Sequence, residues 1–111
     1  MVASRPPKRG EVVLVALDPT RGSEIRKTRP CVVVSPDELN AHLRTVIVAP
    51  LSTGGQKYPF RVRCRFASRS GEVVVDQLRT IDRERVVRHL GRISPATLAQ
   101  ILSTLQEMFA V

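Results

Sequence analysis

The sequence has few of the residues that characterise metalloproteins, disulfide-rich proteins or membrane proteins. Its two cysteines and two histidines are too few and too far apart for a zinc site. Cys31 and Cys64 lie in apolar runs, so we interpret them as small core residues in a reducing compartment. No segment approaches the ~20 apolar residues of a membrane-spanning helix, and the N-terminal residues lack a signal-peptide core. We therefore expect a cytoplasmic protein without a zinc site or a membrane-spanning helix.

The short motifs of several enzyme classes are also missing. The sequence has no HExxH, no GxSxG and no glycine-rich phosphate loop that opens a helix. Two histidines can act as the acid and base of a ribonuclease, but nothing in the sequence brings His42 and His89 together. We therefore favour surface histidines at both positions.

Positive charge is what the sequence has in excess. Lys and Arg total 18 against 10 acidic residues, which gives a net charge of +8 and a pI near 11.0. A small, strongly basic protein attracts polyanions. Nucleic acid is the first candidate partner and a membrane surface the second, with a solvated basic surface as the remaining alternative.

The hydrophobic pattern predicts one mainly β domain at 10–111, preceded by a flexible basic arm at 1–9. Six apolar or alternating runs predict strands, and residues 18–29 and 52–57 are predicted loops. The segment 36–43 is a polar connection that can hold one helical turn. The predicted strands cover 11–17, 31–35, 45–51, 58–66, 71–78 and 86–93.

The last part of the chain has the pattern of a helix. Ser94 suits the N-cap and Pro95 the first helical position. Apolar residues then recur at three- and four-residue spacing, which predicts an amphipathic helix packed on the strands. Short strands with one terminal helix are typical of a small, strongly curved β-barrel.

One predicted strand has a basic face. In YPFRVRCRF at 58–66, the apolar side chains of Phe60, Val62, Cys64 and Phe66 fall on one face. The alternating positions place three arginines on the other face, at Arg61, Arg63 and Arg65.

The predicted loops carry groups that suit RNA cleavage without metal. In that reaction the ribose 2′-OH attacks phosphorus, the phosphorane is stabilised, and the 5′ oxygen is protonated as it leaves. Arginine grips phosphate with two hydrogen bonds, and a hydroxyl adds a donor. Arg29 supplies the first group, and Ser52 with Thr53 supplies the second. By themselves these residues are equally typical of a solvated charge and an ordinary turn.

Four segments, taken together, resemble the MazF/PemK/Kid family of toxins from bacterial toxin–antitoxin pairs. They are RGEVVLVALDPTRGSE, KTRPCVVVS, VAPLSTGGQKYPFRV and GEVVVDQLRTID, and they extend from about Arg9 to Arg83. The resemblance implies an SH3-like β-barrel of the CcdB/Kid/MazF type with a C-terminal helix, a homodimer and no cofactor. It further implies sequence-specific cleavage of single-stranded RNA, chiefly mRNA, to 2′,3′-cyclic phosphate and 5′-hydroxyl ends. Such cleavage inhibits translation and growth.

The resemblance also implies roles for single residues. Arg29 matches the arginine of the family's RP dipeptide, and Ser52 falls where the family has a catalytic threonine, with Thr53 as a substitute hydroxyl. Glu24 matches the acidic residue of GSE, and Asp76 matches an aspartate that is catalytic in the Kid branch. That branch has an arginine where this chain has Val74, so we favour the MazF-type site at Arg29 and Ser52.

The general base stays open between two carboxylates. Arginine remains protonated in proteins and is a poor base, so we expect Arg29 to stabilise the phosphorane and to protonate the leaving oxygen. Glu24 is the nearest carboxylate in sequence. Asp76 is the alternative base, or else a hydrogen-bonded anchor for the turn before Arg79.

RNA binding is expected at the cationic side chains around these segments. The arginines of the basic strand can track the RNA backbone or face the acidic disordered segment of an antitoxin, and either contact would be salt-dependent. The expected set is Lys27, Lys57, Arg61, Arg63, Arg65 and Arg79. Two other functions fit the barrel: a non-enzymatic toxin that binds DNA gyrase, and a nucleic-acid-binding module with a decayed site.

Overall fold

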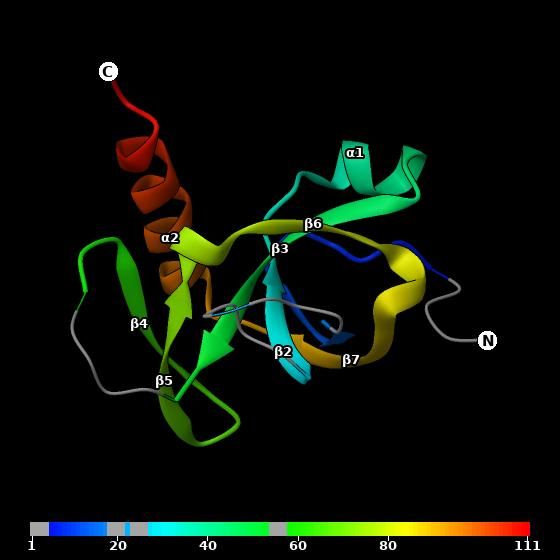
Figure 1. Ribbon diagram of the computed structural model, residues 1–111, viewed down its shortest axis with the longest axis horizontal. Coiled ribbons are helices and arrows are strands. Elements are labelled where there is room, and N and C mark those ends of the chain that lie inside the picture. The colour runs from blue at the N-terminus through cyan, green and yellow to red at the C-terminus, as the bar shows by residue number, and fades with distance from the viewer. Residues whose placement is uncertain (1–4, 18–21, 23–26, 54–57) are drawn as a thin grey trace.

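A computed structural model describes residues 5–17, 22, 27–53 and 58–111. The described chain is mainly β with a C-terminal helix (Figure 1). Its helices are α1 (Asp37–His42), α2 (Pro95–Met108) and two short 3₁₀ helices, η1 (Val75–Gln77) and η2 (Arg83–Arg85). Its strands are β1 (Glu11–Ala16), β2 (Thr28–Val33), β3 (Thr45–Ser52), β4 (Arg61–Phe66), β5 (Arg69–Val74), β6 (Arg79–Asp82) and β7 (Val86–Arg92).

The strands form one antiparallel sheet in the order β4-β5-β3-β2-β1-β7, and β6 also pairs with β3. β3 therefore holds the sheet together, because it pairs with β2, β5 and β6 along different parts of its length. The predicted mainly β fold with a terminal helix is confirmed. Among the described strands β4 and β7 do not pair with each other, so the sheet is curved but not closed by hydrogen bonds.

The sheet separates two apolar clusters. Val12 belongs to the cluster that α2 covers, whereas Val13 and Val15 belong to the cluster on the opposite face. Successive strand side chains point to opposite faces, so the nearly continuous apolar run of β1 reflects burial on both sides. In Figure 1, α2 lies beside β4 at one end of the sheet, and α1 lies at the other.

α2 begins and packs as its sequence predicts. The Ser94 hydroxyl accepts a hydrogen bond from the Thr97 amide at 3.2 Å, and Pro95 follows the cap. Ile101 is fully buried against the sheet, with Leu98 and Leu105 packed on the same cluster. The predicted turn at 36–43 is also confirmed, as α1. No helix in the described part of the chain is long and apolar enough to span a membrane.

Several predicted boundaries differ from the structure. β2 begins at Thr28, and β3 ends with Ser52, so Arg29 and Ser52 lie on strands rather than on the predicted loops. Phe60 does not share the inward face of β4, since it lies in a turn with φ of 62° and is 45% exposed. A positive φ breaks the alternation of a strand, and β4 starts only afterwards.

Part of the predicted basic arm lies within the described residues, and it contacts the sheet and α1. The Arg5 guanidinium pairs with the carboxylate of Glu11. The Arg9 amide donates to Oδ1 of Asp37, and Arg9 Nε donates to the carbonyl of Val34, both at 2.8 Å. Residues 5–9 are therefore tied to β1, to the residue after β2 and to α1.

Candidate active site

A hollow of about 240 Å³ lies where the ends of β2 and β3 meet the β4–β5 hairpin. β2 contributes Arg29 and Pro30, and β3 contributes Leu51, Ser52 and the following Thr53. The remaining lining comes from β7 at Leu90 and from the hairpin at Cys64, Phe66, Ala67, Arg69, Ser70 and Gly71. The hollow thus combines apolar walls with two guanidinium groups and three hydroxyls.

Strand pairing brings the two main predicted site residues together. β2 and β3 are antiparallel, with Cys31 opposite Pro50 and Val32 opposite Ala49. The pairing ends at Cys31 and Pro50, and Arg29 and Ser52 each lie two residues beyond that end, where both line the hollow. Arg29 is exposed and Ser52 half-buried, so their side chains are accessible to a ligand.

Gly71 on β5 fixes how closely the end of β3 approaches. A Cβ atom at this position would lie 2.5 Å from the carbonyl oxygen of Ser52 and 3.7 Å from Cα of Thr53. Glycine within a strand often marks such a close approach of backbone. Only a residue without a side chain lets β5 run this close to the two hydroxyl residues.

The β4–β5 hairpin supplies a cation that the sequence analysis missed. Phe66 pairs with Arg69, so two residues, Ala67 and Ser68, make the turn with φ of 53° and 65°. Positive φ at both positions is typical of a type I′ hairpin turn. The turn places Arg69 in the lining. Asn-Gly or Asp-Gly would have signalled this turn in the sequence, whereas Ala-Ser does not.

Asp76 lies outside this lining, in an ion-pair cluster centred on Arg61. Arg61 Nε and Nη2 donate to the two carboxylate oxygens of Asp76 at 3.0 and 3.2 Å, and Nη1 donates to Glu72 at 3.1 Å. The hydrogen bonds from Arg61 lower the pKa of Asp76, and the bonds to Asp76 raise the pKa of Arg61. Tyr58 stacks on the Arg61 guanidinium, 4.5 Å from ring centroid to Cζ. The Asp76 carboxylate is therefore held by the Arg61 guanidinium, which is itself engaged by the Asp76 and Glu72 carboxylates.

None of the other predicted binding residues that the structure describes lines the hollow. Lys27 is exposed with φ of 65° just before β2, and Arg63 and Arg65 are exposed on β4. Arg79 is half-buried and donates to the carbonyl of Leu17 at 3.5 Å. Glu24 and Lys57 lie outside the described residues.

The two histidines are not brought together. His42 is exposed on α1, where its Nδ1 lies 2.8 Å from the Glu38 carbonyl oxygen. His89 lies on β7 with its Nδ1 2.7 Å from Oε2 of Glu11. Its side chain is only 21% exposed, so the prediction of a surface histidine is wrong for His89. The contact with the Glu11 carboxylate holds the His89 ring against the sheet.

Comparisons with known proteins agree with this architecture. A curated endoribonuclease, MazF9 of Mycobacterium tuberculosis, is 39% identical over 104 residues, covering 85% of this chain and 88% of that protein. The endoribonuclease toxin MazF of Escherichia coli K12 is 34% identical over 102 residues, covering 91% and 92%.

Solved structures give the same result. MazF of Deinococcus radiodurans superimposes with a TM-score of 0.85 at 26% identity, covering 97% of this chain and 100% of that one. A mycobacterial endoribonuclease in complex with its cognate antitoxin gives 0.76 at 26% identity, covering 91% and 92%. The family model of the PemK-like, MazF-like toxins of type II toxin–antitoxin systems matches residues 8–109 of this chain. With nearly the whole chain matched, the protein is a member of that toxin family.

Proposed function

We propose that this toxin is a sequence-specific endoribonuclease that cuts single-stranded RNA, chiefly mRNA, without a metal ion. The ribose 2′-OH attacks phosphorus, leaving a 2′,3′-cyclic phosphate and a 5′-hydroxyl end, and the loss of mRNA inhibits translation and growth. The observation that carries the proposal is the shared hollow of Arg29 and Ser52, two residues 23 positions apart in sequence. The endoribonuclease names of the relatives support the same activity.

Arg29 is assigned to the phosphorane. Its planar fork can donate two hydrogen bonds to phosphate oxygens, and its permanent charge stabilises the negative charge that develops there. We also assign to it the protonation of the leaving 5′ oxygen, with the proton that the general base takes from the 2′-OH restoring the guanidinium. Arg69, which lines the same hollow, adds a second positive charge toward the same anion.

A hydroxyl from Ser52 gives a further donor to the phosphorane. Serine replaces the family's threonine here and keeps the hydroxyl, and Thr53 lies in the same lining as a substitute. The general base is a carboxylate. Glu24 is our first choice, because the Arg61 cluster holds Asp76 ionised but engaged in two hydrogen bonds.

The proposed partners follow from the family. Because a mycobacterial relative has been solved with its cognate antitoxin, we expect an antitoxin whose acidic, disordered segment covers the basic RNA-binding surface. Arg63 and Arg65 are exposed on β4 and suit either the RNA backbone or that segment. A homodimer is expected as the active form.

The decisive experiment is digestion of a long RNA by antitoxin-free protein in EDTA, with mapping of every cut end. We expect cuts at one short recognition sequence, with 5′-hydroxyl ends that polynucleotide kinase labels without prior phosphatase treatment. Arg29→Ala should slow cleavage by about 10²–10³-fold, the usual effect of removing one transition-state donor. Arg44→Ala is the matched control, because Arg44 is an exposed arginine just before β3 and outside the hollow.

Three results would contradict the proposal: intact RNA after incubation with wild-type protein, 5′-phosphate ends, or Arg29→Ala cutting at the wild-type rate. Ser52→Ala and Thr53→Ala, compared in the same assay, identify which hydroxyl acts. RNA that is bound but never cut would instead support a nucleic-acid-binding module with a decayed site.

A further inference from the structure

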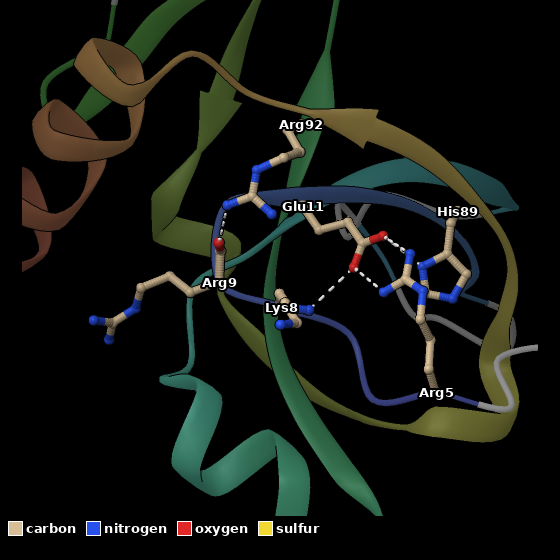
Figure 2. Close-up of polar contacts among 6 residues, drawn as sticks. All are labelled: Arg5, Lys8, Arg9, Glu11, His89 and Arg92. Atoms are coloured by element: carbon tan, nitrogen blue, oxygen red, sulfur yellow. Dashed lines mark hydrogen bonds and ion pairs between the residues drawn. The ribbon is translucent and has the colours of Figure 1, made fainter.

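A second hollow, of about 520 Å³, lies next to the candidate active site. Leu90 of β7 borders both hollows. The polar lining of the second comes from the segment before β1 and from the ends of β1 and β7 (Figure 2). These side chains are Arg5, Lys8, Glu11, His89 and Arg92.

The one carboxylate in this lining is already saturated. Glu11 is 5% exposed. Its oxygens accept from Arg5 Nη1 and Nη2 at 3.2 and 2.6 Å and from the Lys8 amide at 3.0 Å, with His89 Nδ1 at 2.7 Å. Burial by itself would raise the pKa of Glu11, but these hydrogen bonds outweigh it and lower the pKa to about 2. Glu11 therefore stays ionised and holds the surrounding donors in place.

Several cationic side chains in the lining have N–H groups that the hydrogen bonds described here do not use. The pairing with Glu11 uses two of the five N–H bonds of Arg5. Arg92 donates through Nη2 to the carbonyl of Arg9 at 3.1 Å, which orients its guanidinium. Among the described residues, the Lys8 ammonium has no partner. Three cationic side chains thus surround one neutralised carboxylate, and the hollow has a net positive charge.

His89 contributes a polar ring to the same lining. An ionised carboxylate only accepts, so Nδ1 must donate to Glu11. The other ring nitrogen, Nε2, is buried and has no hydrogen-bond partner in the described part of the chain. Buried polar atoms without partners are uncommon in native proteins, and this nitrogen can donate to an anion only when the ring carries a proton at both nitrogens.

We propose that this second hollow binds a backbone phosphate of the RNA, one that flanks the bond cut in the first hollow. The proposal rests on the proposed function. Guanidinium forks and an ammonium are the groups that recognise phosphate. Because the two hollows share Leu90, an RNA strand that occupies the first has phosphates within reach of the second. This continuity favours RNA over a free anion or an acidic peptide.

The test is the salt dependence of RNA binding. The probe is a short single-stranded RNA of mixed sequence with 2′-O-methyl groups throughout, which lacks the attacking hydroxyl and stays uncut. The double variant Lys8→Gln/Arg92→Gln should bind more weakly, and its slope of log K against log salt should be shallower by roughly 0.7 for each phosphate that the variant no longer neutralises. Arg5 is left unchanged, because it holds Glu11.

The matched control is Arg44→Gln/Arg83→Gln. It removes the same charge from residues that lie outside both hollows and near each other, where the Arg83 amide donates to the Arg44 carbonyl. We expect the control to keep the wild-type slope, and both double variants to keep the wild-type far-UV circular dichroism spectrum. Equal slopes for the wild type and the Lys8/Arg92 variant, or an equal decrease in both variants, would overturn the proposal.

Two further probes separate the sources of the anion. In one outcome, inorganic phosphate binding depends on Lys8 and Arg92, but the salt slope of RNA binding does not. That outcome would assign the hollow to a free anion. The same pattern with a poly-glutamate peptide would assign it to a protein partner. Cleavage of RNA by the wild type is measured separately. If RNA is not cut but the salt slope of binding depends on Lys8 and Arg92, only the proposed function is rejected. If RNA is cut but the salt slope is the same in the wild type and the variant, only this site is rejected.

Discussion

Replacing Glu11 with glutamine should destabilise the protein near neutral pH and remove the loss of stability that protonation of this carboxylate causes in acid. Glu11 joins the N-terminal segment to β1 and β7, since it accepts from Arg5, from the Lys8 amide and from His89. Glutamine keeps the size of the side chain but loses the charge, and it turns an amide N–H₂ toward these donors. The variant therefore leaves the Arg5 guanidinium without its counter-charge and the His89 N–H without a carboxylate acceptor.

The magnitude follows from the pKa of the carboxyl. A decrease from 4.5 to about 2 corresponds to about 3 kcal/mol of stabilisation, because each pKa unit is worth about 1.36 kcal/mol. The Arg5 side chain is 54% exposed, so solvent screens part of this interaction, and we expect Glu11→Gln to cost about 2 kcal/mol near neutral pH. Since the folded-state pKa is depressed, this contribution is complete above about pH 5 and is lost as the pH falls toward 2.

Urea unfolding between pH 2 and 7, followed by far-UV circular dichroism, measures this directly. The chain has no tryptophan and one tyrosine, so intrinsic fluorescence is a poor signal. Protomer concentration is held constant, because assembly raises apparent stability. Glu84→Gln, at an exposed glutamate in η2, is the control. A stability difference between wild type and Glu11→Gln that stays constant across this pH range would refute the reasoning.

The remaining predictions concern Gly71 and the two thiols. Gly71→Ala should lower the free energy of unfolding by about 1–3 kcal/mol, because the new Cβ would lie 2.5 Å from the Ser52 carbonyl oxygen. In RNA cleavage, the variant should have a lower kcat with little change in KM. A variant with the wild-type kcat would show that the close approach of β5 to β3 is dispensable. Burial raises the pKa of Cys31 to about 12 and also raises that of the half-buried Cys64. Ellman's reagent should therefore modify Cys64 in the native protein and Cys31 only after unfolding, and early labelling of Cys31 would contradict its burial.

The strands that the sequence predicted are those with long apolar runs. β1 and β3 bury side chains on both faces of the sheet, which leaves a strong pattern in the sequence. β6 was missed, because its four residues, RTID, bury only Ile81. Its position depends on pairing with β3, a contact between segments more than 30 residues apart, and no local pattern records such a contact.

The candidate site was predictable only where it coincided with a family motif. Arg29 and Ser52 came from the resemblance, and the pairing of β2 with β3 ends two residues before each of them, beside the hollow that both line. Arg69 and Gly71 carry no sequence signal, since they matter through a hairpin turn and a backbone approach. The same holds for Asp76, whose engagement by Arg61 requires β4 to lie beside η1.

The sequence by itself therefore determined the class of fold, the helix from its cap onward, the excess of positive charge and the family. These properties reside in composition, in short-range periodicity and in contiguous motifs. The tertiary structure alone decided which charges are available and which are already paired. Arg61 and Glu11 look like ordinary charged residues in the chain, yet both are held in ion pairs with residues at least six positions away. Pairing of this kind depends on strand register, because register sets which distant side chains come within hydrogen-bonding distance.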